Sequence, residues 1–170
     1  INYIGEFRPF GKIYFTDDVT FNGNNGGLLT ISLPAEFHLE KVQNMTLKNT
    51  KIFANAPVHR WFPPAAGFSR LIFDNIDWEI FSGGAIDIKA TDFQIKNNCI
   101  FRGAGSGFRT TSALTIKANA TLEIGFRTSA TFSTLTLESL GSELILNNRS
   151  LLSFYSSTTF LGLGHIKVDG

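Results

Sequence analysis

The feature that most constrains the fold is a repeat of about 22 residues in the second half of the chain. Within each repeat, three short runs alternate large apolar side chains with polar ones, which is the pattern of β-strands with one buried face. Three strands that recur in step indicate a solenoid, in which each turn of the chain stacks on the previous turn. The repeat therefore predicts an all-β, single-stranded parallel β-helix.

Each run predicts columns of side chains that point into the core. The first run gives Trp78, Ile100, Leu122, Leu144 and Ile166, beside Ile80, Arg102, Ile124, Leu146 and Val168, with Arg102 the one exception. The second run gives Ile86, Phe108, Ala130 and Leu152, beside Ile88, Thr110, Phe132 and Phe154. The third run gives Leu71 and Phe73, then Phe93 and Ile95, and continues one residue early at Leu114 and Ile116, followed by Leu135 and Leu137.

An asparagine column marks a corner between two strands. Asn75, Asn97 and Asn119 recur at the interval of the repeat, and Gly141 takes the next place. Asn and Gly adopt the left-handed backbone region at the least cost, and a tight corner requires that conformation. Stacked Asn amides can also bond to one another along the axis. We interpret the column as an amide ladder; the alternative is that Asn is simply common in loops.

Short strands, a tight Asn-bearing corner and a period in the low twenties resemble the right-handed parallel β-helix class, the pectate-lyase-like and tailspike-like solenoids. The resemblance covers residues 71–170 well and 19–70 loosely, where MTLKNTKIF (45–53) repeats the corner motif. Val19 and Phe21 are expected to begin an earlier turn, which gives six to seven turns over residues 19–170. A β-sandwich would need turn signals every ~8–12 residues without a fixed register. Residues 1–18 fit the period less well and are expected to be an N-terminal cap or an irregular segment.

Charge and composition exclude several function classes. Fifteen basic and fourteen acidic side chains leave a net charge of +1, which does not suit a nucleic-acid partner. No apolar run approaches ~18 residues, so we expect no membrane insertion. Cys99 is the only cysteine, so the chain has no internal disulfide. The absence of a leader before Ile1 suggests a processed chain or a fragment. The pattern runs at full strength to Gly170, which suggests more chain, a further domain or a partner subunit beyond it.

Asp77 and Glu79 are the candidates for catalysis, because they lie on the outward side of one strand at i and i+2, a spacing suited to an acid and base pair. The alternative is two solvated charges. Relatives that cleave pectate hold calcium with several Asp residues, but here Asp77 is followed in its column by Cys99 and Thr121. The lyase chemistry is therefore not carried over to any residue.

We expect no cofactor and no metal site. Glu143 is expected to lie beside His165 as an ion pair, because the column offers no third metal ligand. Cys99 falls in the outward column of the first run and is expected to be exposed.

The most distinctive surface candidate is residues 55–69, which make their turn longer than the repeat. Three prolines in this segment cannot donate to a strand ladder, so a projecting loop is expected. His59, Arg60, Trp61 and Phe62 form a candidate ligand-binding platform for a surface glycan or a receptor protein. The alternative is that Trp61 and Phe62 fold back over the coil as a hydrophobic clasp.

Three functions remain open. LTIKANATLEI (114–124) and STLTLESLGSELILNN (133–148) resemble passenger segments of secreted bacterial adhesins and autotransporters. The leading expectation is thus a non-enzymatic module, secreted or displayed on a cell or virion surface, that acts as a shaft for adhesion. The first alternative is a phage tail-spike or fibre segment, a homotrimer that binds host polysaccharide and buries outward Phe101 and Ile145. The second is a polysaccharide hydrolase or lyase that uses Asp77 and Glu79.

Overall fold

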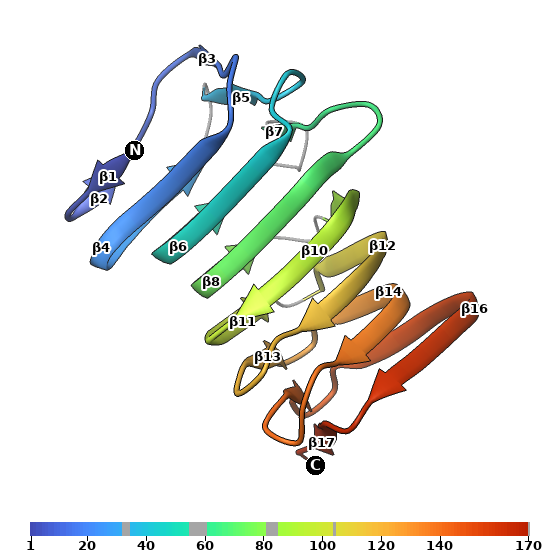
Figure 1. Ribbon diagram of the computed structural model, residues 1–170. Coiled ribbons are helices and arrows are strands. Elements are labelled where there is room, and N and C mark those ends of the chain that lie inside the picture. Colours follow the sequence, from blue (N-terminus) through green and yellow to red (C-terminus); the bar gives the residue numbers. More distant parts are fainter. Residues whose placement is uncertain (32–34, 55–60, 81–84, 104, 170) are drawn as a thin grey trace.

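The computed structural model describes residues 1–31, 35–54, 61–80, 85–103 and 105–169. Over these residues the chain is an all-β parallel solenoid of about six turns with a spacing of about 22 residues, and it contains no helix (Figure 1). The predicted fold class is confirmed. Within the described residues, no helix is long and apolar enough to cross a membrane.

The strands are short, except where a strand bends around a corner and continues on the next face. They are β1 (Asn2–Tyr3), β2 (Glu6–Phe7), β3 (Lys12–Tyr14), β4 (Val19–Ile31), β5 (Glu36–His38), β6 (Asn44–Ala54), β7 (Trp61–Phe62), β8 (Phe68–Ile80), β9 (Ala85–Ile88), β10 (Ala90–Lys96), β11 (Asn98–Arg102), β12 (Gly107–Ile116), β13 (Thr121–Ile124), β14 (Ser129–Leu137), β15 (Glu143–Leu146), β16 (Leu151–Gly162) and β17 (His165–Val168).

The stacked turns form three faces, and every described strand pair is parallel. Face A contains β1, the first halves of β4, β6 and β8, then β10 and the second halves of β12, β14 and β16. Face B contains β2, the second halves of β4, β6 and β8, then β11, β13, β15 and β17. Face C contains the three-stranded sheet β3-β5-β7, then β9 and the first halves of β12, β14 and β16.

Two of the three predicted runs have the predicted register. On face A, Leu71 pairs with Phe93, Phe93 with Leu114 and Leu114 with Leu135, including the step that comes one residue early. On face C, Phe108 pairs with Ala130, and Ala130 with Leu152. Apolar alternation was sufficient here because the inward residues of the central turns, such as Phe93, Phe108 and Leu114, are buried in one core cluster.

The first run is wrong by one residue at β11. Trp78 pairs with Phe101 rather than Ile100, and Cys99 pairs with Leu122. Cys99 and Phe101 are therefore inside the core, 1% and 0% exposed, whereas Ile100 lies outside and is half-buried. The cause is the corner: the first core residue of face B follows the corner Asn by one position at Ile76, but by two positions at Cys99. One added residue reverses which side chains of a strand face the core.

Stacked phenylalanines fill the cross-section of the coil. The rings of Phe101 and Phe108 stack at 4.1 Å with an interplanar angle of 10°, and Phe73 meets Phe93 edge-on at 5.0 Å. Phe108 in turn contacts Phe132 one turn further along, at 6.1 Å. Aromatic pairs at these separations contribute attraction beyond the burial of apolar area. The abundance of Phe in the composition thus serves the core.

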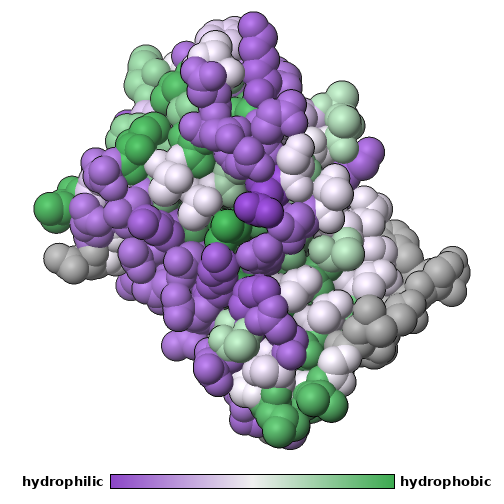
Figure 2. Space-filling view, viewed as in Figure 1, coloured by the Kyte–Doolittle hydropathy of each residue, from purple (hydrophilic) through white to green (hydrophobic). Residues whose placement is uncertain are grey.

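The two ends of the described coil differ. Residues 1–18, expected to be a cap or irregular, pair in parallel through β1, β2 and β3 with the turn below and so form a further short turn. Val19 and Phe21 begin the next turn, as predicted, and pair with Met45 and Leu47. At the other end all four residues of β17 are exposed, and Val168 is 72% exposed. Figure 2 shows hydrophobic side chains gathered at this lower end.

Candidate functional site

The Asn corner between faces A and B has the expected left-handed backbone. Asn49, Asn75, Asn97 and Asn119 have φ of 51°, 58°, 53° and 59°. Asn75 Nδ2 donates to Asn49 Oδ1 and Asn49 Nδ2 donates to Asn22 Oδ1, both at 3.2 Å. Below this point the ladder changes partners, because Asn97 Nδ2 donates to Asp74 Oδ1 at 2.5 Å. The side-chain amides of Asn49, Asn75 and Asn97 are thus bonded to the turn above and stabilise the stacking of the corner.

Gly141 occupies the next place for another reason than the one predicted. Its backbone is not left-handed, so the expectation that it replaces Asn for its backbone freedom is wrong. A Cβ at this position would instead collide with Asn119 Oδ1 in the turn above. The close approach of the Asn119 side chain, not a positive φ, accounts for the glycine.

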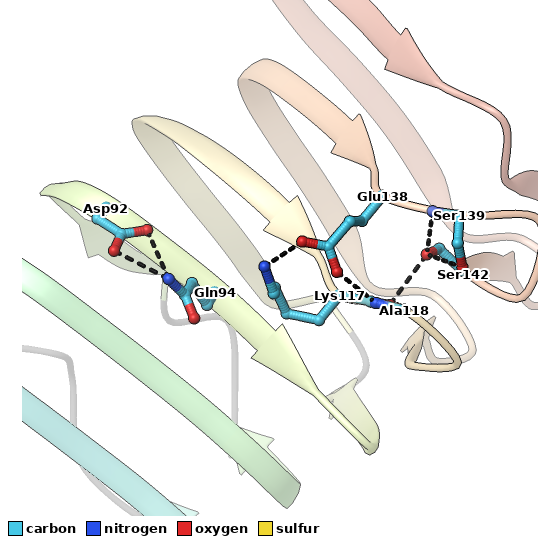
Figure 3. A network of polar contacts seen from close by, with 7 residues as sticks. All are labelled: Asp92, Gln94, Lys117, Ala118, Glu138, Ser139 and Ser142. Carbon is cyan, nitrogen blue, oxygen red and sulfur yellow. Dashed lines mark hydrogen bonds and ion pairs between the residues drawn. The ribbon is translucent and has the colours of Figure 1, made fainter.

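Charged side chains on the outside pair along the axis, from one turn to the next. Arg70 Nε bonds Asp92 Oδ2 at 2.9 Å, and Lys167 Nζ bonds Glu143 Oε1 at 2.5 Å. Figure 3 shows a third case, in which Glu138 accepts from both the Lys117 ammonium and the Ala118 backbone N–H. These bonds hold neighbouring turns in register and leave the paired groups engaged.

The two carboxylates considered for catalysis share one arginine. Arg102 Nε and Nη2 donate to the two oxygens of Asp77, each at 2.7 Å, and Nη2 lies 3.6 Å from Glu79 Oε2. The hydrogen bond to Asp77 raises the pKa of Arg102. A bidentate guanidinium–carboxylate pair of this kind fixes geometry between turns. Asp77 and Glu79 therefore belong to an ion-pair network that joins β8 and β11.

Neither the cysteine nor the described histidines form a reactive or metal-binding group with their neighbours. Cys99 was expected to be exposed but lies in the core, where burial raises the pKa of its thiol to about 12. His165 is the register neighbour of Glu143, as expected, but the Glu143 carboxylate pairs with Lys167. Among the described residues, no group of three or more His, Cys, Asp or Glu side chains could hold a metal ion.

The structure describes the later part of the segment 55–69, from Trp61 onward. His59 and Arg60 lie outside the described residues. Trp61 and Phe62 form β7 and pair with β5, and Phe68 is already a core residue of β8, 2% exposed. Trp61 and Phe62 are therefore part of the sheet of face C, and residues 63–67 connect them to β8.

Phe62 lies in a stack of three rings on the outside of face C, which the sequence reasoning missed. The His38 ring lies 4.7 Å from Phe62 at 7° and 4.3 Å from Tyr14 at 19°. We call Tyr14, His38 and Phe62 the ring stack. Its members are separated by two equal steps that are slightly longer than the repeat, so a search at the period of the repeat does not detect them.

Carboxylates hold the edge of the central ring of this stack. His38 Nδ1 lies 2.9 Å from Glu40 Oε1, and Nε2 lies 3.3 Å from Glu36 Oε2. The hydrogen bond with Glu40 is the first cause of a raised pKa of His38, and Glu36 adds to it. Lys12 Nζ approaches Glu36 at 3.5 Å from the turn above. The stack therefore favours the protonated imidazolium form of His38, which lies between the rings of Tyr14 and Phe62.

A second corner, between faces B and C, also escaped the sequence reasoning. Gly105, Arg127 and Arg149 recur one repeat apart and have φ of 76°, 55° and 60°. The turn at Arg127, for example, is closed by Thr128 N donating to Gly125 O at 3.1 Å. The column was missed because Gly and Arg share no chemical likeness, although they share a backbone conformation.

A shallow pocket on face C lies beside the prolines that follow β7. Its lining residues are Pro63, Pro64, Ala65, Asp87, Ile88, Lys89, Arg109 and Thr111. The prolines cannot donate to a ladder, and within the described residues β7 pairs with β5 but not with β9. The pocket thus results from an interruption of the sheet.

In comparisons with known proteins, no family model, no curated protein and no solved structure matches the chain.

Proposed function

We propose that the chain is a non-enzymatic β-helix module, secreted or displayed on a cell or virion surface, which serves as a shaft for adhesion to a receptor protein or a surface glycan. The observation that supports this function most is the use of outward polar groups. On faces A and B, the arginines Arg70 and Arg102 and the carboxylates of Asp77 and Glu138 bond to the neighbouring turn. Such side chains stabilise a coil and do not converge on a reacting atom.

The class of β-helix to which the chain is assigned is part of the same proposal. The Asn corner and the period resemble right-handed pectate-lyase-like and tailspike-like solenoids, and residues 114–148 resemble adhesin and autotransporter passengers in repeat style. The trimeric tail-spike alternative expected Phe101 and Ile145 to point outward and to be buried between subunits. Ile145 does point outward, half-buried on face B, whereas Phe101 is inside the core.

A paired assay tests the absence of catalysis. The purified chain is incubated with a panel of neutral and acidic polysaccharides, while binding and the release of new chain ends are measured on the same samples. We expect binding without cleavage, and the double variant Asp77→Asn/Glu79→Gln should bind like the native chain. Cleavage that disappears in this variant would replace the shaft with the hydrolase or lyase.

A further inference from the structure

We propose that Arg127 and Arg149, at the corner between faces B and C, form a binding site for carboxylate-bearing glycans. This inference rests on the proposed adhesive function and names its ligand class. The two residues, which we call the arginine pair, occupy the same place in successive turns and are both exposed. Adjacent strands of the coil lie about 4.8 Å apart, so the backbones of the two residues lie about one strand spacing apart.

The backbone under the arginine pair is unfavourable for arginine. A non-glycine residue with φ of 55° or 60° costs free energy, which Asn and Gly reduce. The chain places Gly105 at this corner one turn above, and uses Asn at four left-handed positions of the other corner. Two positively charged arginines in strained positions are a departure from the residue choice that best suits folding.

Neither arginine has an acidic partner in the part of the chain that the structure describes. Arg70 and Arg102, by contrast, bond carboxylates of the neighbouring turn. Arg127 contacts an aromatic ring: its Cζ lies 5.1 Å from the centroid of Phe126, which is itself 50% exposed. This contact holds the guanidinium in place without neutralising it.

The neighbouring part of face C carries polar side chains and no carboxylates. Over residues 107–111, 129–133 and 151–154 the outward side chains include Arg109, Thr131 and Ser153, and no Asp or Glu occurs in these three segments. The nearest acid in register is Asp87, opposite Arg109 at the upper edge of this area. A ligand that runs from the corner onto face C would therefore meet positive charge and hydroxyl groups. On the face B side, the carboxylate of Glu123 lies near the corner, where its Oε1 accepts a hydrogen bond from Asn147 Nδ2 at 2.6 Å.

A glycan suits these features better than nucleic acid does. Planar guanidinium groups bind carboxylates through two parallel hydrogen bonds, and hydroxyl side chains exchange hydrogen bonds with sugar hydroxyls. Exposed Phe126 and Leu151 offer apolar surface for the C–H faces of sugar rings. A net charge of +1 does not provide the extended positive field that a phosphate backbone requires.

The test compares three forms of the chain by calorimetry. The probe is a hyaluronan oligosaccharide, with its carboxyl-reduced form as the uncharged counterpart. The variant Arg127→Asn/Arg149→Asn removes both charges but keeps residues suited to the left-handed backbone. The matched control, Lys48→Gln/Lys96→Gln, removes the same charge from face A. We expect the arginine variant to weaken binding of the charged probe at least about tenfold, and the control to change it little.

Stability provides an independent readout. Because Asn relieves the strain at these positions, the arginine variant should unfold at the same temperature as the native chain or at a higher one. If the variant unfolds earlier, Arg127→Lys/Arg149→Lys replaces it: this form keeps the charge and loses the bidentate fork, and binding should still weaken.

Four results with the two glycan probes would overturn the inference. The first is an equal loss of binding in the Lys48→Gln/Lys96→Gln control, and the second is undiminished binding by the Arg127→Asn/Arg149→Asn variant. The third is equal binding of the carboxyl-reduced probe, and the fourth is no binding of the charged probe. Binding of the uncharged probe alone would leave the proposed adhesive shaft intact. Tighter binding of a single-stranded DNA of equal charge would also overturn it, in favour of nucleic acid.

Discussion

At the scale of single residues, backbone conformation explains positions that side-chain chemistry does not. Asn49, Asn75, Asn97 and Asn119 share a left-handed backbone, and so do Arg127 and Arg149, although only the first group suits it well. The asparagines were visible in the sequence because residue type and conformation agree there. The arginines were not visible, because residue type and conformation disagree.

Asn75 allows a direct measurement of the corner. Alanine tolerates the left-handed backbone at φ 58° less well than asparagine does, and Asn75→Ala also removes the hydrogen bond to Asn49. The variant should therefore lower the free energy of unfolding by ~1–2 kcal/mol. Asn75→Gly keeps the backbone freedom and should cost less. Urea denaturation of the two variants measures the difference, and an Ala variant as stable as the Gly variant would contradict the role assigned to the backbone.

His38 predicts a dependence of stability on pH. Its pKa is raised in the folded chain by Glu40 and Glu36, so the stabilisation is fully present below the unfolded value of 6.5 and is lost as pH rises through the folded value. Glu40, whose pKa is lowered by the bond to His38, acts in the opposite sense and loses its contribution in acid. The unfolding temperature should therefore fall as pH rises above about 6.5.

The control for this prediction is His38→Gln, which keeps a polar side chain and removes the titration. Its unfolding temperature, followed by circular dichroism from pH 5 to 9, should show a flatter slope above pH 6.5 than that of the native chain. Parallel slopes in the two proteins would show that the carboxylates do not hold the imidazolium.

At the scale of strands, the sequence predicted the three runs of strands and the register of two of them. It did not predict which side chains of β11 face the core. Alternation identifies a buried face only if the corner before the strand has a constant length, and the corner before Cys99 is one residue longer than the one before Ile76. One sign was available: the predicted column placed Arg102 inside, where an unpaired charge is costly. Shifting the strand by one residue moves Arg102 to the surface and Phe101 to the core.

The register of β11 can be measured with two alanine variants. Phe101→Ala removes a fully buried ring that stacks on Phe108, so it should lower the free energy of unfolding by ~3–5 kcal/mol. Ile100→Ala acts at a half-buried outward position and should cost about 1 kcal/mol or less. Chemical denaturation distinguishes them, and a larger loss for Ile100→Ala would restore the column predicted from the repeat.

At the scale of the whole molecule, the coil behaves as a stack in which each turn contacts only its neighbours. A turn in the middle is held from both sides, whereas β17 is held from one side and exposes Ile166 and Val168. Period and composition were sufficient to predict this architecture. They could not predict which outward groups stay unpaired, because pairing depends on side-chain positions in adjacent turns.

Hydrogen exchange should follow the position in the stack. Amides of β10, β11 and β12, in the central turns, should exchange more slowly than those of β17 and of β1 to β3. Mass spectrometry of peptic fragments after timed exchange measures the gradient. Uniform protection along the chain would show instead that the turns unfold as one cooperative unit.

Burial of Cys99 has a practical consequence for all such measurements. The only thiol of the chain lies in β11, in the central part of the stack, 1% exposed and held in its unreactive protonated form. A thiol-specific dye can react only after the surrounding turns separate, so the rate of labelling reports how often the middle of the coil opens. Labelling of the native Cys99 therefore measures local opening of the coil, and no reporter residue has to be introduced.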